Sequence, residues 1–348
     1  MMKFWRLGRR KYLKSLIFYM DTSRRQFISV LGQLLLFPAV ASLSAGTVPD
    51  IGKGKKVTFG IISDIHKGLQ KDAERRLGIF IDKAIEKRPD FIIQLGDMTH
   101  GKPEDVEAML EVWNRFPGKK YHVLGNHEMD GGDKGALVKQ LQMPGNFYSF
   151  DVDGYHFVVL DANYFKQGGR FYDKRPSKRE GLPVVNELLS DAELEWLKKD
   201  LLGTRKPSIL FSHEAFDDIW QAPCSSSTGD VRRIIREVNA VKPEGFKVIA
   251  SICGHHHIDN HKVIQGVQYI QINSASYFWI GHAAAFSNGH MAEYKHPLFA
   301  FITLDSEAGT IEIKGTQSEF LPPVPIRENY PQADKLYPGI KDRVIVYR

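Results

Sequence analysis

Five short motifs in this chain place histidine, aspartate or asparagine directly after an apolar run that is typical of a buried strand. They are Ser63-Asp64-Ile65-His66, Gly96-Asp97, Gly125-Asn126-His127, Ser212-His213 and Gly254-His255-His256-His257. Carboxylate, amide and imidazole groups in this mixture are ligands for several divalent metals. A pair of such metals acidifies a bound water and absorbs the charge that builds on phosphoryl oxygens. The motifs therefore indicate a two-metal site suited to phosphate-ester hydrolysis.

The strands that precede the first three motifs are expected to lie side by side. Periodicity in this region predicts strands at 57–63, 91–95 and 121–124 and helices at 73–87 and 103–116. A β-α-β-α-β order gives a parallel sheet whose loops gather at the carboxyl ends of the strands. The motifs stand at those ends, so their side chains should meet. Asp64 and His66, two residues apart, can face one metal only if the chain leaves its strand conformation there.

Beyond these motifs the pattern predicts more core elements and one long connection. Residues 162–189 are polar and rich in glycine and basic residues, and a stretch of that length is predicted to be a functional or mobile loop. Further strands are predicted at 147–152, 155–160, 208–212 and 247–253, helices at 133–141, 190–202 and 230–241, and purely β structure at 261–265, 267–273, 298–304 and 310–314.

Taken in this order, the motifs resemble those of the calcineurin-like metallophosphoesterase superfamily over roughly residues 57 to 275. The resemblance implies an α/β fold, a four-layer α/β/β/α sandwich of two mixed β-sheets flanked by helices. It implies two divalent metal ions (Mn, Fe, Zn or mixed). The first would be held by Asp64, His66, Asp97 and His257, and the second by Asp97, Asn126, His213 and His255.

The same resemblance assigns a reaction. A hydroxide bridging the metals would attack phosphorus in line, with Asp97 as the bridging carboxylate and His127 as the catalytic histidine that assists the leaving group. Glu128 is a candidate for orienting His127, as carboxylates often orient imidazoles. Any one of these histidines alone is as well explained as a structural residue. The ordered set of five motifs is what favours the catalytic interpretation.

Two motif residues differ from those of known subfamilies, which narrows the range of expected activities. The residue three after Asp97 is His100, not the tyrosine of purple acid phosphatases, so no iron–tyrosinate centre is expected. Leu124 stands where protein Ser/Thr phosphatases carry arginine, which disfavours a phosphoprotein phosphatase. Phosphodiesterase and phosphomonoesterase activity both remain open. The alternative is a catalytically silent scaffold of the same fold that binds a protein partner, but such decay should remove ligands, and every expected position is filled.

The positive charge of the chain belongs to its first 45 residues. The net charge is +6 with a pI near 9.0, yet residues 1–45 hold eight Lys and Arg and one acid, which leaves 39 basic and 40 acidic residues elsewhere. No nucleic-acid partner is therefore expected. The expected partner is a small phosphate-ester substrate, and the oligomeric state stays open. Cys224 and Cys253 are too few for a disulfide framework, and a bridge between them is also open.

Residues 1–45 resemble a twin-arginine export signal. Ser23-Arg24-Arg25-Gln26-Phe27 precedes a moderately apolar run over residues 30–43. We expect an exported, periplasmic or extracellular protein that meets the membrane only through the export machinery. A basic amphipathic helix or a membrane anchor is the alternative. The expected organisation is a signal peptide at 1–45, a metallophosphoesterase domain at 46–315 and a Pro-rich C-terminal tail at 316–348 packed on that domain, with the cleavage site and the true start (Met1 or Met20) undetermined.

Overall fold

The computed structural model describes residues 56–173, 184–218, 224–280, 291–328, 330 and 332–348. The expected export signal lies outside these residues and stays a prediction. Within the described ranges, no helix is long and apolar enough to span a membrane. Cys224 and Cys253 both lie in the described part and are free thiols.

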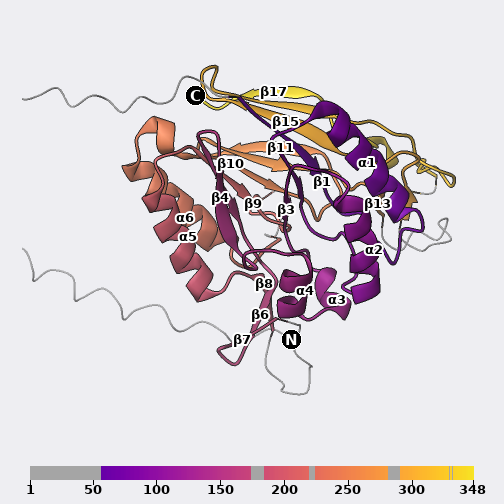
Figure 1. Cartoon of the computed structure of the whole chain (residues 1–348), viewed down its shortest axis with the longest axis horizontal. Helices are drawn as coiled ribbons and strands as arrows, with labels where there is room; N and C mark the ends of the chain where they lie inside the picture. Colours follow the sequence, from indigo (N-terminus) through magenta and orange to yellow (C-terminus); the bar gives the residue numbers. More distant parts are fainter. Residues whose placement is uncertain (1–55, 174–183, 219–223, 281–290, 329, 331) are drawn as a thin grey trace, which may run out of the picture. The chain divides into compact units, whose positions relative to one another are not determined.

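The first of two large sheets contains the predicted parallel strands (Figure 1). Its strand order is β17-β16-β15-β1-β2-β3. Strands β1, β2 and β3 run parallel, and β15, β16 and β17 extend the sheet in antiparallel fashion. The strands are β1 (Lys56–Ile62), β2 (Phe91–Gln94), β3 (Lys119–His122), β15 (Ala300–Asp305), β16 (Thr310–Gly315) and β17 (Arg343–Val346). The crossovers between the parallel strands are α1 (Ala73–Lys87) and α2 (Pro103–Trp113).

The second large sheet is also mixed, with the order β11-β12-β10-β9-β5-β4. Its four central strands are parallel and its two edge strands are antiparallel to their neighbours. They are β4 (Tyr148–Val152), β5 (Tyr155–Val159), β9 (Ser208–Phe211), β10 (Val248–Cys253), β11 (Asn260–Ile264) and β12 (Val267–Gln271). Helices α5 (Asp191–Gly203) and α6 (Thr228–Val241) belong to this half of the fold, and α5 begins at the predicted cap, where Ser190 Oγ accepts the Glu193 N–H at 3.2 Å.

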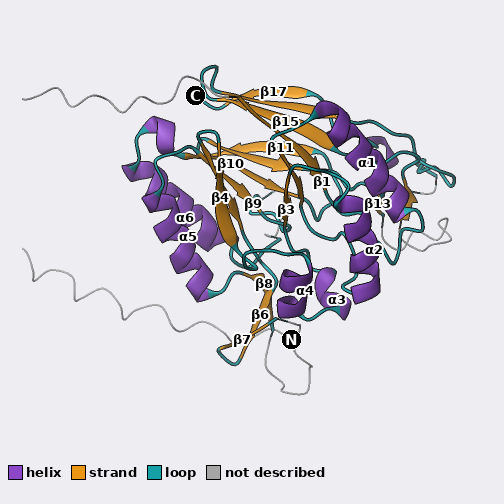
Figure 2. Ribbon diagram, in the orientation of Figure 1, coloured by secondary structure: helices purple, strands orange, loops and turns teal. Residues whose placement is uncertain are grey.

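The two sheets face each other and the helices lie outside them, which confirms the four-layer sandwich (Figure 2). Phe59 on β1 contacts Phe157 and Phe211 of the opposite sheet, with ring centroids 6.0 and 5.7 Å apart. Successive side chains of a strand point to opposite faces of the sheet, so one strand contributes to two hydrophobic clusters. On β5, Phe157 belongs to the cluster between the sheets, while Val158 belongs to the cluster under α5 and α6.

One part of the chain differs from the prediction, and the C-terminal stretch adds a strand that was not predicted. Residues 162–189 were expected to be a loop, but their described part contains three short strands, β6 (Tyr164–Gln167), β7 (Arg170–Tyr172) and β8 (Val185–Leu188), which pair in the order β7-β6-β8. The C-terminal stretch after residue 316 contributes β17, whose Ile345 is buried against the first sheet. The remaining elements are α3 (Glu128–Gly131), α4 (Lys134–Gln140), β13 (Tyr277–Trp279), β14 (Met291–Glu293) and 3₁₀ turns at Glu244–Phe246 and Ala333–Lys335.

A buried histidine on β5 makes the stability of this fold dependent on pH. His156 Nδ1 lies 2.7 Å from Asp151 Oδ1, and its Nε2 lies 2.7 Å from Asp200 Oδ2. Burial by itself would lower the pKa of His156, but the bonds to Asp200 and Asp151 raise it above the ordinary 6.5. The contacts of charged His156 with the two aspartates therefore stabilise the fold fully at pH values below the ordinary pKa of histidine. That contribution is lost as pH rises through the raised one.

We expect His156→Gln to lower the free energy of unfolding by on the order of 1 kcal/mol at about pH 6, with the difference from wild type shrinking by about pH 9. The magnitude is modest because Asp151 is half exposed and water screens its charge. Urea unfolding of both proteins at the two pH values measures this difference. An effect of the same size at both would contradict the assignment.

Candidate metal centre

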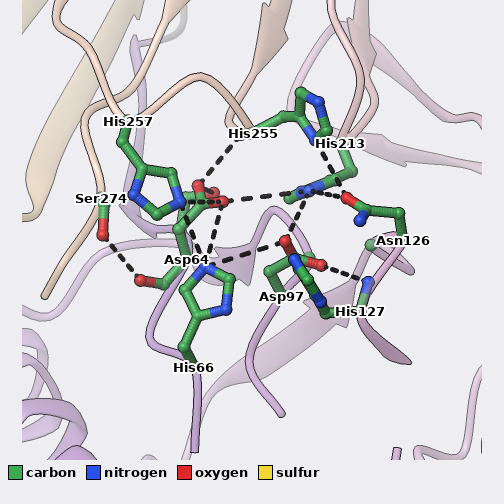
Figure 3. Close-up of polar contacts among 12 residues, drawn as sticks. Asp64, His66, Asp97, Asn126, His127, His213, His255, His257 and Ser274 are labelled. Atoms are coloured by element: carbon green, nitrogen blue, oxygen red, sulfur yellow. Dashed lines mark hydrogen bonds and ion pairs between the residues drawn. The ribbon is translucent and has the colours of Figure 1, made fainter. Parts of the chain in front are cut away.

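The five motifs converge on one place, as Figure 3 shows. Asp64 and His66 follow β1, Asp97 follows β2, and Asn126 with His127 follows β3. From the second sheet, His213 follows β9, and His255 and His257 follow β10. All of these positions are carboxyl ends of parallel strands, where the loops of such sheets gather. The structure thus brings together all seven predicted ligands and His127.

The backbone turns sharply at the predicted ligands. A positive φ is uncommon outside glycine and tends to mark functional sites. It occurs here at Asp64 (55°), His66 (59°), Asp97 (52°), His255 (69°) and His257 (54°). These left-handed turns take the chain out of its strands, as the spacing of Asp64 and His66 requires. Gly96, with φ of 97°, admits the close approach, since a Cβ there would lie 2.6 Å from His213 Nδ1.

The side chains of the predicted ligands form two adjoining groups, one from each predicted ligand set. Asp64, His66 and His257 each offer an atom within 4.8 Å of the others, and so do Asp97, His213 and His255. Asn126 joins the second group, because its Oδ1 lies 3.0 Å from His255 Nδ1 and 3.2 Å from His213 Nε2. Asp97 Oδ2 lies 3.1 Å from His213 Nε2 and 3.8 Å from His66 Nε2, which places it between the groups.

One carboxylate oxygen in this cluster accepts no hydrogen bond from the described residues. Asp64 is fully buried, and its Oδ1 has no hydrogen-bond donor among the described residues. His257 Nε2 lies 3.2 Å from this oxygen, and the Nε2 atoms of His66 and His213 each lie 3.9 Å away. Buried carboxylates are normally paired or bound to a metal. An unsatisfied oxygen facing three imidazoles is what a cation site presents, so the residues fit divalent metals.

Hydrogen bonds, burial and nearby charges set the protonation of these histidines in different ways. His213 Nδ1 lies 2.8 Å from the carbonyl of Leu95, and His257 Nδ1 lies 2.8 Å from the carbonyl of Tyr277. A carbonyl only accepts, so each Nδ1 carries a proton and each Nε2 is the nitrogen that faces the ligand cluster. Burial alone would lower the pKa of His213, but Asp97 and Asp64 raise it, so a metal at that Nε2 would displace a proton. Burial lowers the pKa of His66 and of His255 to about 3, which keeps these imidazoles neutral.

Glu128 does not orient His127, contrary to the prediction. Its carboxylate is buried and accepts backbone N–H groups instead: those of Asp97 and Gly125 at 2.8 Å and that of Thr99 at 3.0 Å. It therefore ties the loop after β2 to the loop after β3. Burial and the charge of Asp97 raise the pKa of Glu128 to about 7.

Asp130 is the residue that contacts the imidazole of His127. His127 lies just before α3, and Asp130, three residues later, reaches back so that its Oδ2 is 2.6 Å from His127 Nδ1. Residues three apart share a helix face, whereas adjacent residues do not. His100 Nδ1 lies 3.2 Å from the same oxygen, so Asp130 serves two imidazoles. The sequence signal that was missed is this spacing.

Two serines that were not predicted hold the first motif in place. Ser274 Oγ donates to the carbonyl of Asp64, and Ser276 Oγ donates to the carbonyl of Ile65, both at 2.8 Å. The run Ser274-Ala275-Ser276 follows strand β12 and so reaches the same edge of the fold. A serine pair after a buried strand was the available signal, although it does not name the partner.

A model of the family described as calcineurin-like phosphoesterase matches residues 57–259, more than half of the chain, and that span contains every predicted ligand. The chain belongs to this family. It is accordingly a hydrolase of phosphate esters, and the metals that its buried aspartates and histidines fit are divalent ions.

Named relatives agree with this assignment. The phosphoesterase is 27% identical over 271 residues to the manganese-dependent ADP-ribose/CDP-alcohol diphosphatase of Oryza sativa subsp. japonica, covering 63% of this chain and 83% of that protein. It is 24% identical over 155 residues to the Arabidopsis thaliana protein of the same name, covering 37% and 50%. A dimetal phosphatase from Danio rerio superposes with a TM-score of 0.58 at 16% identity over 84% of this chain and 99% of that one, which shows the shared fold.

Removal of the Glu128 carboxylate should destabilise the metal-free phosphoesterase strongly. Glu128→Ala would leave three buried backbone N–H groups without an acceptor, for which we expect a loss of about 2–5 kcal/mol. Glu128→Gln keeps one carbonyl acceptor and should lose less. Urea unfolding measures both, and wild-type stability in the alanine variant would show that the bonds contribute nothing net.

Proposed function

We propose that this phosphoesterase binds two divalent metal ions through seven side chains and hydrolyses small phosphate compounds between them. One ion would be held by Asp64, His66, Asp97 and His257, and the other by Asp97, Asn126, His213 and His255. The observation that carries the proposal is the buried Asp64 Oδ1, which faces three imidazoles and has no donor within the described part of the chain. A silent scaffold is disfavoured because no predicted ligand is missing.

Each residue has a task in this reaction. Bound metals would acidify water and neutralise the phosphoryl oxygens. Asp97 has a second contact besides the imidazoles, because its Oδ1 accepts the backbone N–H of His127 at 2.8 Å and so fixes that residue relative to the metals. His127 is partly exposed at the edge of the cluster. Burial alone would lower the pKa of His127, but the Asp97 charge and the Asp130 bond raise it, so the imidazole can hold a proton for the leaving oxygen.

We further propose a nucleotide-linked diphosphate as substrate and manganese as the preferred ion. The support is the name shared by the two plant relatives, manganese-dependent ADP-ribose/CDP-alcohol diphosphatase. The partly exposed Trp279 is also consistent with such a substrate. Its ring centroid lies 6.5 Å from that of His257, which is close enough for a base to stack beside the cluster.

Export is proposed as the setting of this activity. The twin-arginine motif at residues 23–27 supports a periplasmic or extracellular enzyme. Export by this route carries folded proteins, which suits a domain whose metals are bound across two sheets.

The decisive experiment compares ADP-ribose, a CDP-alcohol, para-nitrophenyl phosphate and bis-para-nitrophenyl phosphate as substrates of the manganese-loaded protein. We expect turnover that a chelator abolishes and that His127→Ala lowers about 100-fold or more, within the range for loss of a general acid. His156→Gln is the matched control, because that histidine lies on β5 away from the motifs, and it should keep wild-type turnover. Failure of the wild type to bind manganese would refute the proposal.

Asp130→Asn should lower kcat about tenfold while leaving KM nearly unchanged, because the variant no longer holds His127 in one orientation. Asp133→Ala is a close control. Asp133 caps α4 by accepting the Ala136 N–H at 2.9 Å, so its loss should reduce stability by about 1 kcal/mol and leave kcat unchanged. Steady-state kinetics and urea unfolding separate the two effects. An equal fall of kcat in both variants would mean that Asp130 acts through general stability alone.

A further inference from the structure

Tyr277 carries a buried hydroxyl that the reaction described so far does not use. Its side chain is fully buried, and its oxygen makes no hydrogen bond with any described residue. Buried tyrosine hydroxyls normally have a partner, because desolvating the group without one is unfavourable. An unpaired donor in this position indicates an acceptor other than the described residues.

The ring of Tyr277 lies against the metal centre. Its centroid is 5.2 Å from that of His66 and 4.9 Å from that of His257, two of the residues proposed for the first ion. Its main-chain carbonyl accepts the Nδ1 proton of His257 at 2.8 Å, which anchors the start of β13 to the same group. Tyr277 therefore borders the site on the side formed by these two histidines.

A phenol hydroxyl is a suitable partner for an anionic oxygen. A neutral phenol can donate a hydrogen bond to an anionic oxygen and adds no negative charge that would repel it.

A second buried tyrosine shows what a structural hydroxyl looks like in this fold. Tyr294 is also fully buried, and its hydroxyl donates to Asn273 Oδ1 at 3.0 Å. Two tyrosines with the same burial thus differ in one respect. The hydroxyl of Tyr294 has a partner among the described residues, and that of Tyr277 has none.

We propose that the Tyr277 hydroxyl donates a hydrogen bond to a phosphoryl oxygen of the bound substrate, on the side of the centre bordered by His66 and His257. This inference rests on the proposed function and adds a substrate-contacting residue to it. A phosphate ester, a diphosphate and free inorganic phosphate all present the required oxygen. Phosphate can therefore serve as a probe without knowledge of the natural substrate.

We expect Tyr277→Phe and Tyr294→Phe to differ both in their effect on the unfolding midpoint and in their effect on kcat/KM. In the metal-free protein, Tyr277→Phe removes an unsatisfied group, so its midpoint of urea unfolding should stay unchanged or rise. Tyr294→Phe breaks a satisfied bond and leaves Asn273 Oδ1 without it, so that midpoint should fall. With manganese bound, Tyr277→Phe should lower kcat/KM about tenfold or more, the range for a charge-assisted bond, whereas Tyr294→Phe should keep it.

Phosphate binding to the manganese-loaded protein decides the assignment, with manganese affinity measured beside it by equilibrium dialysis. We expect Tyr277→Phe to bind phosphate about tenfold more weakly or worse while manganese affinity is retained. Equal phosphate affinity in wild type and variant would overturn the inference, and so would a loss of manganese affinity, which would assign the hydroxyl to the metals. A wild type that binds manganese but no phosphate would overturn the proposed function as well, so the two failures are distinguishable.

Discussion

The buried carboxylate of Glu128 is the contact on which the arrangement of the site depends. It accepts three backbone N–H groups from the loops that follow β2 and β3, and these loops carry Asp97 and Asn126. The parallel strands bring the loops to one edge, and these bonds, together with the bond from the His127 N–H to Asp97 Oδ1, hold them in register with each other. A residue that has no proposed part in the chemistry thus sets the positions of two that do. Its effect reaches the ligands because backbone amides, unlike flexible side chains, transmit a displacement directly to the residues they belong to.

The second constraint is the charge that the site concentrates. Asp64 and Asp97 are both buried among imidazoles, and Asp64 Oδ1 has no hydrogen bond from the residues that the structure describes. Burial by itself would raise the pKa of both carboxylates, but His257 and His213 beside Asp64, and His213 beside Asp97, bring the two pKa values below the usual range, so both groups remain anionic. Divalent cations would satisfy these anions. Metal binding should accordingly stabilise the folded state by mass action, as it does wherever a ligand binds only the folded protein.

Prediction from sequence succeeded where the signal was local and failed where it depended on orientation or on a distant partner. Each motif follows a strand whose periodicity is visible in the residues themselves. The choice of Glu128 as the partner of His127 was wrong because a helix begins at residue 128, so the residue that faces the imidazole is Asp130. Strands β6 and β8 were missed because their pairing joins segments about twenty residues apart with mostly half-buried side chains, which leave no alternating pattern to detect.

The sequence by itself determined the type of chemistry and the order of the motifs. Residue types and short spacings decide which atoms are available as ligands, and strand periodicity decides that each motif follows a strand. Only the tertiary structure decided which atoms meet. His66 and His257 are 191 residues apart, yet their Nε2 atoms lie 3.1 Å from each other. That contact requires two sheets packed face to face and left-handed turns at both residues, and the same packing places the ring of Tyr277 against His66. Such a juxtaposition arises from the register and packing of whole sheets, a property that no short stretch of sequence contains.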